Sequence, residues 1–299
     1  MMSEYDHLLK PGALWAILLD RSAQAHEQNA ILPIPTDPEV IEQDGVAFQV
    51  RVIKALAMKA LVSAAKSQNN PFLPYDPDLF VADLSTTHVA LLNKFNVVDH
   101  HLLIVTRSFE PQEALLMRDD CAALLIGLSE IDGLAFYNAG RTAGASQSHK
   151  HLQLVPLSAF PHSNVPIEPL LQSARRIGAT GTVPGLPFVH AYARMDPTWL
   201  DQPSDGASSL LSQYHQLLLA VGMPVALDAE SPATVAYNLL VTRQWLLLVP
   251  RSQEFFEGMS INALGFAGAF LVKDHAQLET LRTRGPMTAL KHVTRPRRN

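Results

Sequence analysis

Two pairs of apolar runs, each pair joined by a short polar turn, constrain the fold more than any other feature of this 299-residue sequence. The first pair covers residues 88–95 and 101–106, and the second covers residues 237–242 and 245–250. Apolar runs of strand length with only a few residues between them favour antiparallel hairpins. Both first runs contain an asparagine and both second runs are followed by an arginine, so we interpret the hairpins as a degenerate internal duplication.

Other segments show helical or strand periodicity around these hairpins. Leu14, Ile17 and Leu18 fall on one face of a helix predicted over residues 11–30. Apolar side chains alternate in residues 45–52, as in a half-buried strand. The remaining predicted elements are a surface loop over residues 67–77, a helix over residues 118–130, strands over residues 134–138 and 149–156, and a helix near residues 210–221.

This order of elements predicts an α+β fold in which helices flank a mainly antiparallel sheet. We expect two similar halves that pack on each other. Residues 1–160 form the N-terminal catalytic half with a helical extension, and residues 234–299 form the second half. Residues 161–233 are rich in Pro, Gly, Ser and Asp, so we interpret them as a connector or insertion.

The composition limits the class of protein and its partners. The formal net charge is −5 with acidic and basic residues interspersed, so we expect no broad basic surface for nucleic acid. No apolar run approaches the roughly 20 residues of a membrane span. Cys121 is the single cysteine, and residues 1–7 lack the basic and apolar regions of a secretory signal. We therefore expect a cytoplasmic protein with small-molecule partners; the oligomeric state stays open and is compatible with a monomer.

The strongest chemical signal lies in residues 149–156. His149, His151 and Gln153 alternate along the predicted strand, so their side chains lie on one face and Lys150 lies on the other. One face of this strand is therefore polar, in a chain whose other strands are largely apolar.

A loop of small residues, A-G-R-T-A-G-A-S-Q-S, precedes this strand at residues 139–148. Its backbone N–H groups and the hydroxyls of Ser146 and Ser148 can approach an anion closely. A neutral histidine beside a bound phosphate can attack phosphorus and leave again, which splits one displacement into two. The segment thus predicts nucleotidyl transfer through His151, with Gln153 holding a phosphate oxygen.

Two other interpretations of the His-x-His pattern are a metal site and a pair of hydrogen-bonded core histidines. No further histidine or carboxylate pair stands nearby at zinc-ligand spacing, so we expect no metal site. The sequence also contains no G-x-x-x-x-G-K-[ST] phosphate loop, no dinucleotide fingerprint after a strand and no G-x-S-x-G. The preceding Gly and Ser run favours the nucleotidyl-transfer interpretation over the core interpretation.

Five strings carry a resemblance to a known family. They are N-P-F-L-P-Y-D-P-D-L-F, L-L-N-K-F-N-V-V-D-H-H-L-L-I-V-T, Y-N-A-G-R-T-A-G-A-S-Q-S-H-K-H-L-Q-L-V-P, Y-N-L-L-V-T-R-Q-W-L-L-L-V-P-R and S-I-N-A-L-G-F-A-G. In this order they resemble the ATP adenylyltransferases, also called diadenosine tetraphosphate phosphorylases, a branch of the histidine triad superfamily. The resemblance implies a histidine-triad-like fold and a reversible reaction in which inorganic phosphate cleaves a dinucleoside polyphosphate to ADP and ATP.

The same resemblance implies roles for individual residues. His151 corresponds to the nucleophile that holds AMP covalently, His149 supports it, and Gln153 stands where ordinary triad hydrolases have a third histidine. Because an amide is no general base for water, Gln153 fits transfer of AMP to phosphate. We interpret His100 and His101 as structural.

The resemblance also places Asn138, Gly144 and Ser146 at phosphate-contacting positions and Asn93 at the ribose-contacting position. From the residues themselves, Lys54 and Lys94 are compatible with solvated surface groups, and Asn262 and Lys273 with ordinary turn and strand positions. The full set of candidate substrate-binding residues is Asn93, Lys94, Asn138, Gly144, Ala145, Ser146, Gln147, Lys54, Asn262 and Lys273.

Two rival functions remain at this point. Hexose-1-phosphate uridylyltransferases also use His-x-His-x-Gln, but they commonly have a cysteine-containing zinc site and a proline between the two histidines, whereas this chain has Cys121 alone and H-K-H. A nucleotide-binding regulator without turnover would keep the pocket but need no nucleophile. We expect no tightly bound cofactor; Mg²⁺ can accompany the polyphosphate, but no ligand set for it is visible.

Overall fold

The computed structural model describes residues 8–54, 70–223, 225 and 236–297 of the chain. The interpretation of residues 1–7, and the first part of the loop predicted over residues 67–77, lie outside this range. In the part of the chain that is described, no helix is both long and apolar enough to cross a membrane.

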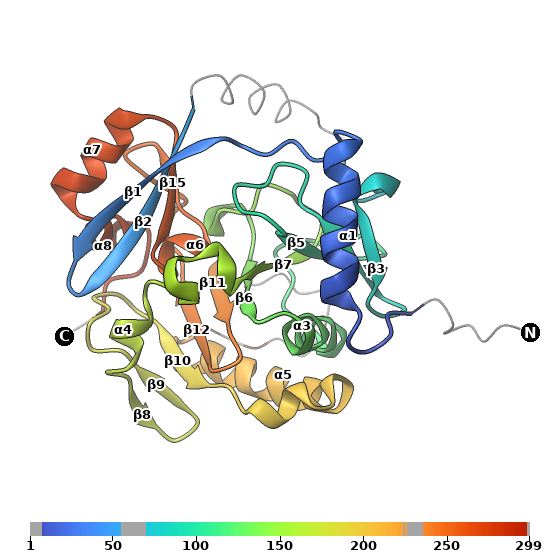
Figure 1. Cartoon of the computed structure of the whole chain (residues 1–299). Coiled ribbons are helices and arrows are strands. Elements are labelled where there is room, and N and C mark those ends of the chain that lie inside the picture. Colours follow the sequence, from blue (N-terminus) through green and yellow to red (C-terminus); the bar gives the residue numbers. More distant parts are fainter. Residues whose placement is uncertain (1–7, 55–69, 224, 226–235, 298–299) are drawn as a thin grey trace, which may run out of the picture.

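A ten-stranded sheet forms the centre of the molecule, in the order β3-β4-β5-β7-β6-β11-β12-β10-β9-β8 (Figure 1). Every pairing in this sheet is antiparallel. The inner strands are buried along almost their whole length, which explains their continuous apolar runs. In sheet order, the bounds are Phe80–Asp83, His88–Leu92, Leu102–Thr106, His151–Pro156, Gly133–Asn138, Tyr237–Val241, Trp245–Pro250, Ala191–Arg194, Thr180–Thr182 and Arg175–Ile177.

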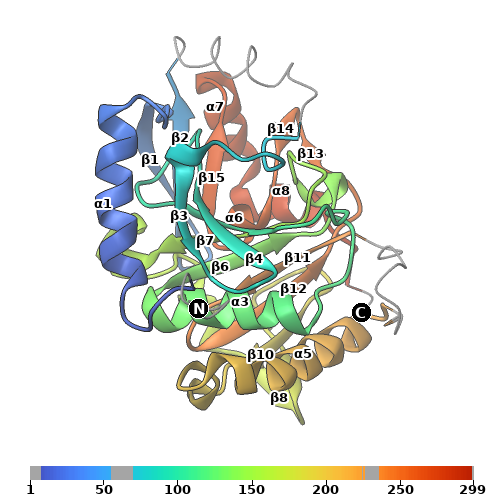
Figure 2. The same cartoon turned by 90° about the vertical axis from the view of Figure 1, so that its right-hand side faces the viewer.

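Three long helices cover one face of this sheet. They are α1 (Leu14–Glu27), α3 (Arg118–Glu130) and α5 (Pro203–Ala220). α3 and α5 lie side by side, with α1 beside the β3 edge (Figures 1 and 2). Their apolar faces share one buried cluster with the side chains of the sheet on that face.

A smaller layer covers the other face. β1 (Thr36–Gln43) and β2 (Val46–Ile53) pair antiparallel, and β15 (Ala269–Val272) pairs parallel with β2. A second buried cluster joins this three-stranded sheet to the large sheet. The other elements on this side are the β13–β14 hairpin (Phe255–Phe256 and Met259–Ser260) and helices α4 (Glu168–Leu171), α6 (Ala263–Phe266), α7 (His275–Arg284) and α8 (Pro286–His292).

The predicted α+β class, with an antiparallel sheet flanked by helices, is confirmed, and so are both hairpins. The helix predicted near residues 210–221 begins earlier, at Pro203, because a proline at its first position fits the helix start. Residues 161–233 supply α5 and the strands β8, β9 and β10. These strands have only three or four residues each, too few to show periodicity. The division into two halves and a connector stays a prediction.

Candidate active site

A cleft of about 1310 Å³ lies between the large sheet and the three-stranded sheet. Strands β4, β5 and β7, the loop before β7, and the elements β2, β14, β15, α6 and α7 all contribute to its wall. The predicted site residues that line it are His151, Gln153, Asn93, Lys94, Gly144, Ser146, Gln147, Asn262 and Lys273. The structure therefore places most of the predicted site residues around one cavity.

His151 opens β7 and faces this cleft although only 4% of its surface is exposed. Its Nδ1 lies 2.8 Å from the carbonyl oxygen of His149. A carbonyl only accepts, so Nδ1 carries the ring proton and Nε2 keeps its lone pair. Burial lowers the pKa of His151 to about 4, which makes the imidazole neutral at pH 7. The ring therefore offers an Nε2 lone pair that is chemically able to attack an electrophile.

Gln112 holds the backbone of His151 in place. Its Oε1 accepts the His151 N–H at 2.8 Å, and its Nε2 donates to the carbonyl oxygens of Asn138 (2.9 Å) and His151 (3.1 Å). The hydroxyl of buried Tyr137 donates to the Gln112 carbonyl at 2.6 Å. Sequence reasoning missed Gln112, because nothing in the pattern around residue 112 indicates that it reaches β7.

His149 lies outside the cleft wall and contacts the His151 ring through its backbone carbonyl. Its Nε2 lies 2.9 Å from the Thr106 carbonyl oxygen, so this nitrogen is the donor and Nδ1 accepts from the Asn70 amide at 3.0 Å. The rings of Phe72 and Phe109 pack against it with centroids at 5.6 and 5.5 Å. Both ring nitrogens of His149 are hydrogen-bonded to other residues, so the ring is fixed in place. The contact of His149 with His151 is made by its backbone carbonyl.

Gln153 is oriented by a chain of hydrogen bonds that begins at a backbone amide. The Phe95 N–H donates to Asn93 Oδ1 at 3.2 Å, so the Asn93 amide nitrogen faces His101 Nδ1. His101 Nδ1 then accepts, and His101 Nε2 donates to Gln153 Oε1 at 2.9 Å. The Gln153 amide N–H groups are thus left for the cleft.

His101 lines the cleft and is 7% exposed, and burial lowers its pKa to about 4. We interpreted it as structural from the sequence. Its contact with Gln153 connects it directly to a residue of the proposed chemistry, and only the pairing of β5 with β7 brings the two together.

The small-residue loop approaches the C-terminal part of the chain very closely. Gly144 has φ of +87°, and a Cβ placed there would lie 2.8 Å from the Cβ of Asn262. A side chain fits neither this conformation nor this space, so the position requires glycine. Asn262 in turn caps α6 through its side-chain oxygen, which accepts the Leu264 N–H at 3.0 Å.

Asn138 is placed differently from its expected phosphate-contacting position. It is 1% exposed and is absent from the cleft wall. Its Oδ1 accepts from the Asn238 amide at 2.8 Å and from the Ala263 N–H at 3.0 Å. Buried Arg251 donates to Asn238 Oδ1 and to the Ala143 carbonyl. The cluster of Asn138, Asn238 and Arg251 therefore holds the small-residue loop in place through its backbone.

The predicted basic residues differ in their surroundings. Lys94 lines the cleft with its Nζ 3.6 Å from Asp76 Oδ2, and Lys273 also lines it. Lys54 pairs with Asp37 at 3.2 Å and is not part of the wall, nor is Ala145.

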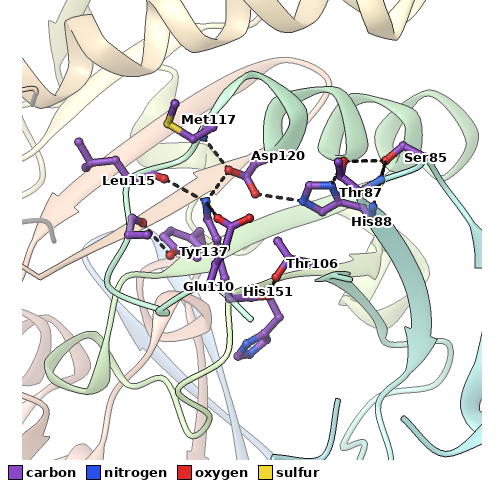
Figure 3. A network of polar contacts seen from close by, with 12 residues as sticks. Ser85, Thr87, His88, Thr106, Glu110, Leu115, Met117, Asp120, Tyr137 and His151 are labelled. Carbon is purple, nitrogen blue, oxygen red and sulfur yellow. Dashed lines mark hydrogen bonds and ion pairs between the residues drawn. The ribbon is translucent and has the colours of Figure 1, made fainter. Parts of the chain in front are cut away.

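A buried ion pair lies between the start of β7 and helix α3 (Figure 3). Lys150 is fully buried, and its Nζ donates to Asp120 Oδ2 at 2.6 Å, to the Leu115 carbonyl and to Glu110 Oε2. Asp120 Oδ1 lies 3.0 Å from His88 Nε2. Burial opposes the charge of Asp120, yet the His88 hydrogen bond and the Lys150 charge hold the pKa of this carboxyl below its usual value. In Figure 3 the His151 ring points away from this network.

Among the residues that the structure describes, no three His, Cys, Asp or Glu side chains are grouped as metal ligands.

Comparisons with known proteins show the family to which the chain belongs. The model of the Ap4A phosphorylase N-terminal domain matches residues 4–173, and the model of the ATP adenylyltransferase C-terminal domain matches residues 184–296. Diadenosine 5',5'''-P1,P4-tetraphosphate phosphorylase 2 of Saccharomyces cerevisiae is 31% identical over 274 positions, which cover 82% of this chain and 81% of the relative.

Solved structures show the same fold. The crystal structure of yeast Ap4A phosphorylase Apa2 superimposes with a TM-score of 0.76 at 23% identity, covering 96% of this chain and 98% of that one. The structure of Apa2 in complex with Ap4A gives a TM-score of 0.75 at 22% identity, with the same coverage. The predicted histidine-triad-like fold is thereby confirmed. The chain belongs to the family of Ap4A phosphorylases and ATP adenylyltransferases.

Proposed function

We propose that this enzyme is a diadenosine tetraphosphate phosphorylase, which uses inorganic phosphate to cleave Ap4A reversibly to ADP and ATP. The observation that carries the proposal is the His151 imidazole, which lines the cleft, is neutral and keeps the Nε2 lone pair because Nδ1 donates to the His149 carbonyl. The related yeast enzyme Apa2 has been crystallised in complex with Ap4A, which supports this choice of substrate.

The reaction proceeds in two displacements. Nε2 of His151 attacks the phosphorus nearest one adenosine, the bond from that phosphorus to its bridging oxygen breaks, and ATP leaves with the electron pair. An oxygen of inorganic phosphate then attacks the same phosphorus, the N–P bond breaks, and the electron pair returns to Nε2 as ADP forms. Each step is reversible, and His151 ends in its starting state.

Gln153 explains why phosphate is used instead of water. Its amide N–H groups can donate to a non-bridging oxygen of the adenylyl phosphate, where negative charge develops. Neither this amide nor the neutral His101 behind it can take a proton from water, because the pKa of His101 is about 4 and its Nδ1 already accepts from Asn93. Inorganic phosphate already has a negatively charged oxygen that can attack phosphorus, so it needs no general base.

The other predicted residues that line the cleft are assigned to parts of the substrate. We assign Asn93 to the ribose, and the loop residues Gly144, Ser146 and Gln147 to the adenylyl phosphate. Among the other candidates, Lys94, Lys273 and Asn262 contact the rest of the polyphosphate. Asn138 and His149 lie outside the cleft wall, and we assign them to positioning of the small-residue loop and of the His151 ring. Ala145 and Lys54 also lie outside the wall, and we assign them no contact with the substrate.

We also place the enzyme in the cytoplasm, acting on free nucleotides with no membrane or nucleic-acid partner. The buried thiol of Cys121, the single cysteine, supports a reducing compartment. Mg²⁺ can accompany the polyphosphate as part of the substrate.

The test is product analysis with labelled Ap4A, with and without phosphate. The wild type is expected to release ATP and retain an acid-labile, alkali-stable AMP adduct without phosphate, and to release ADP once phosphate is added. His151→Ala should form no adduct, whereas the matched variant His162→Ala changes an exposed histidine outside the cleft and should behave as wild type. A fully active His151→Ala variant would refute the mechanism, and binding without product would indicate a regulator.

A second variant tests the role of Gln153. Gln153→His supplies a side chain that can accept a proton, so the products are expected to shift from ADP plus ATP toward AMP plus ATP. Unchanged dependence on phosphate would remove this explanation of acceptor choice.

A further inference from the structure

One buried hydrogen-bond donor in the cleft has no partner in the part of the chain that is described. Gln277, in the first turn of α7, is 6% exposed and lines the cleft. The Lys273 N–H donates to its Oε1 at 2.9 Å, which fixes the orientation of the amide. Its Nε2 then has no acceptor. A buried donor without a partner is costly, so the position favours a ligand that accepts.

The open space beside this donor belongs to the cleft. Gly258 forms the tip of the β13–β14 hairpin and also lines the cavity. A Cβ added to Gly258 would lie 3.8 Å from Gln277 Nε2 and would contact nothing else within 4 Å. Gly258 therefore leaves room for a methyl-sized group within 4 Å of the amide nitrogen.

Cationic side chains line the same wall. Arg51 and Leu271 face each other across β2 and β15, and both line the cleft, as do their buried neighbours Val50 and Phe270. Arg51 Nη1 donates to the Thr36 hydroxyl at 3.4 Å, and no carboxylate among the described residues pairs with this guanidinium. Lys273 follows two residues after Leu271 on the same side. Among the described residues, the carboxylate that contacts Gln277 is that of Asp274, which caps α7 and accepts the Gln277 backbone N–H at 2.9 Å.

This wall is continuous with the small-residue loop at residues 139–148. Gly144 abuts Asn262, and from Asn262 the cleft wall continues through Ser260 back to Gly258 and Gln277. A substrate whose reacting phosphorus lies at His151 can therefore extend along one side of the cavity toward α7.

We propose that Gln277, Arg51 and Lys273 form a subsite for the phosphate groups of the leaving nucleoside triphosphate, with a phosphate oxygen accepting the hydrogen bond from Gln277 Nε2. A phosphate oxygen accepts without donating and carries negative charge, so it satisfies the amide and both cations. The inference rests on the proposed function and identifies where the leaving half of the substrate binds.

The experiment compares two ligands by calorimetry. One is AMP, which has no leaving half. The other is an Ap4A analogue with methylene groups in place of the bridging oxygens next to both adenylyl phosphorus atoms, which cannot be cleaved there. The variants are Gln277→Met, which removes the donor without adding charge, and Gln277→Glu, which keeps an oxygen for the Lys273 N–H. Gln172→Met, at an exposed position outside the cleft, is the control.

The Kd for AMP is expected to stay within about twofold in every variant. The Kd for the analogue should rise at least about tenfold in Gln277→Met and further in Gln277→Glu, since the carboxylate repels phosphate. Unchanged analogue affinity in both variants, or a parallel loss of AMP affinity, would overturn the subsite. Failure of the wild type to bind the analogue and to release ATP from Ap4A would instead refute the proposed function, and the subsite with it.

Discussion

Removal of the ammonium group behind the nucleophile tests whether the buried ion pair holds β7 in place. In Lys150→Met, Glu110 is half-exposed and regains water, but Asp120 is 2% exposed and stays buried without its cationic partner. Breaking one partner of a buried pair costs about 3–5 kcal/mol. With a guanidinium slope of roughly 4–6 kcal/mol/M, the unfolding midpoint should fall by about 0.5–1.3 M.

The assay is guanidinium unfolding at pH 7 with a double-mutant cycle. Lys150→Met combined with Asp120→Asn removes both charges and should recover more than half of the loss, whereas exposed Lys291→Met should change stability by less than about 0.5 kcal/mol. Because the pKa of Asp120 is held below 3.8, its ordinary value, the charge-dependent part of the loss is present above that pH and disappears as pH falls further. A loss below about 1 kcal/mol at pH 7, or no recovery in the double variant, would refute the reasoning.

Three further perturbations address the site. His101→Phe keeps a ring but removes the hydrogen bond that orients Gln153, so formation of the AMP adduct should slow by about 10- to 100-fold while AMP affinity is retained; equal rates in rapid-quench measurements would contradict this. Gly144→Ala should lower both the melting temperature and AMP affinity, because it combines positive φ with a close contact, whereas Gly178→Ala has positive φ in open space and should cost only about 1–2 kcal/mol. The free energy of unfolding should fall as pH decreases from 6.5 to about 4, because unfolding lets the buried neutral rings of His101 and His151 take up protons; a flat profile over that range would be inconsistent with their lowered pKa.

Local periodicity was enough to predict the elements that carry the chemistry. The alternation along residues 149–153 predicts that His149, His151 and Gln153 share a face and that Lys150 lies opposite. The structure places His151 and Gln153 at the cleft and Lys150 against α3, whereas His149 lies outside the cleft wall. The regular part of β7 begins only at His151, since Lys150 donates its backbone N–H to the Glu110 carbonyl outside the sheet ladder.

The misses have a common physical origin. Asn138 directly precedes the small-residue loop at residues 139–148, yet its side chain is hydrogen-bonded to Asn238 and to the Ala263 backbone, 100 and 125 residues away. Gln277 lies on a short polar helix whose sequence resembles an ordinary surface helix. Hydrogen bonds between distant segments leave no period in the sequence, so neither their partners nor an unsatisfied amide could be predicted from it.

The cluster of Asn138, Asn238 and Arg251 has a consequence for biosynthesis. A nascent chain that ends after β7 already contains the nucleophile, but it lacks the side chains that secure the Ala143 carbonyl and the loop around it. At a synthesis rate of roughly 5–20 residues per second, these partners follow His151 about 4–20 s later. The ribosome-bound N-terminal part would therefore carry His151 beside a loop that is not yet secured, and we expect reactivity toward nucleotides only when the C-terminal strands have joined the sheet.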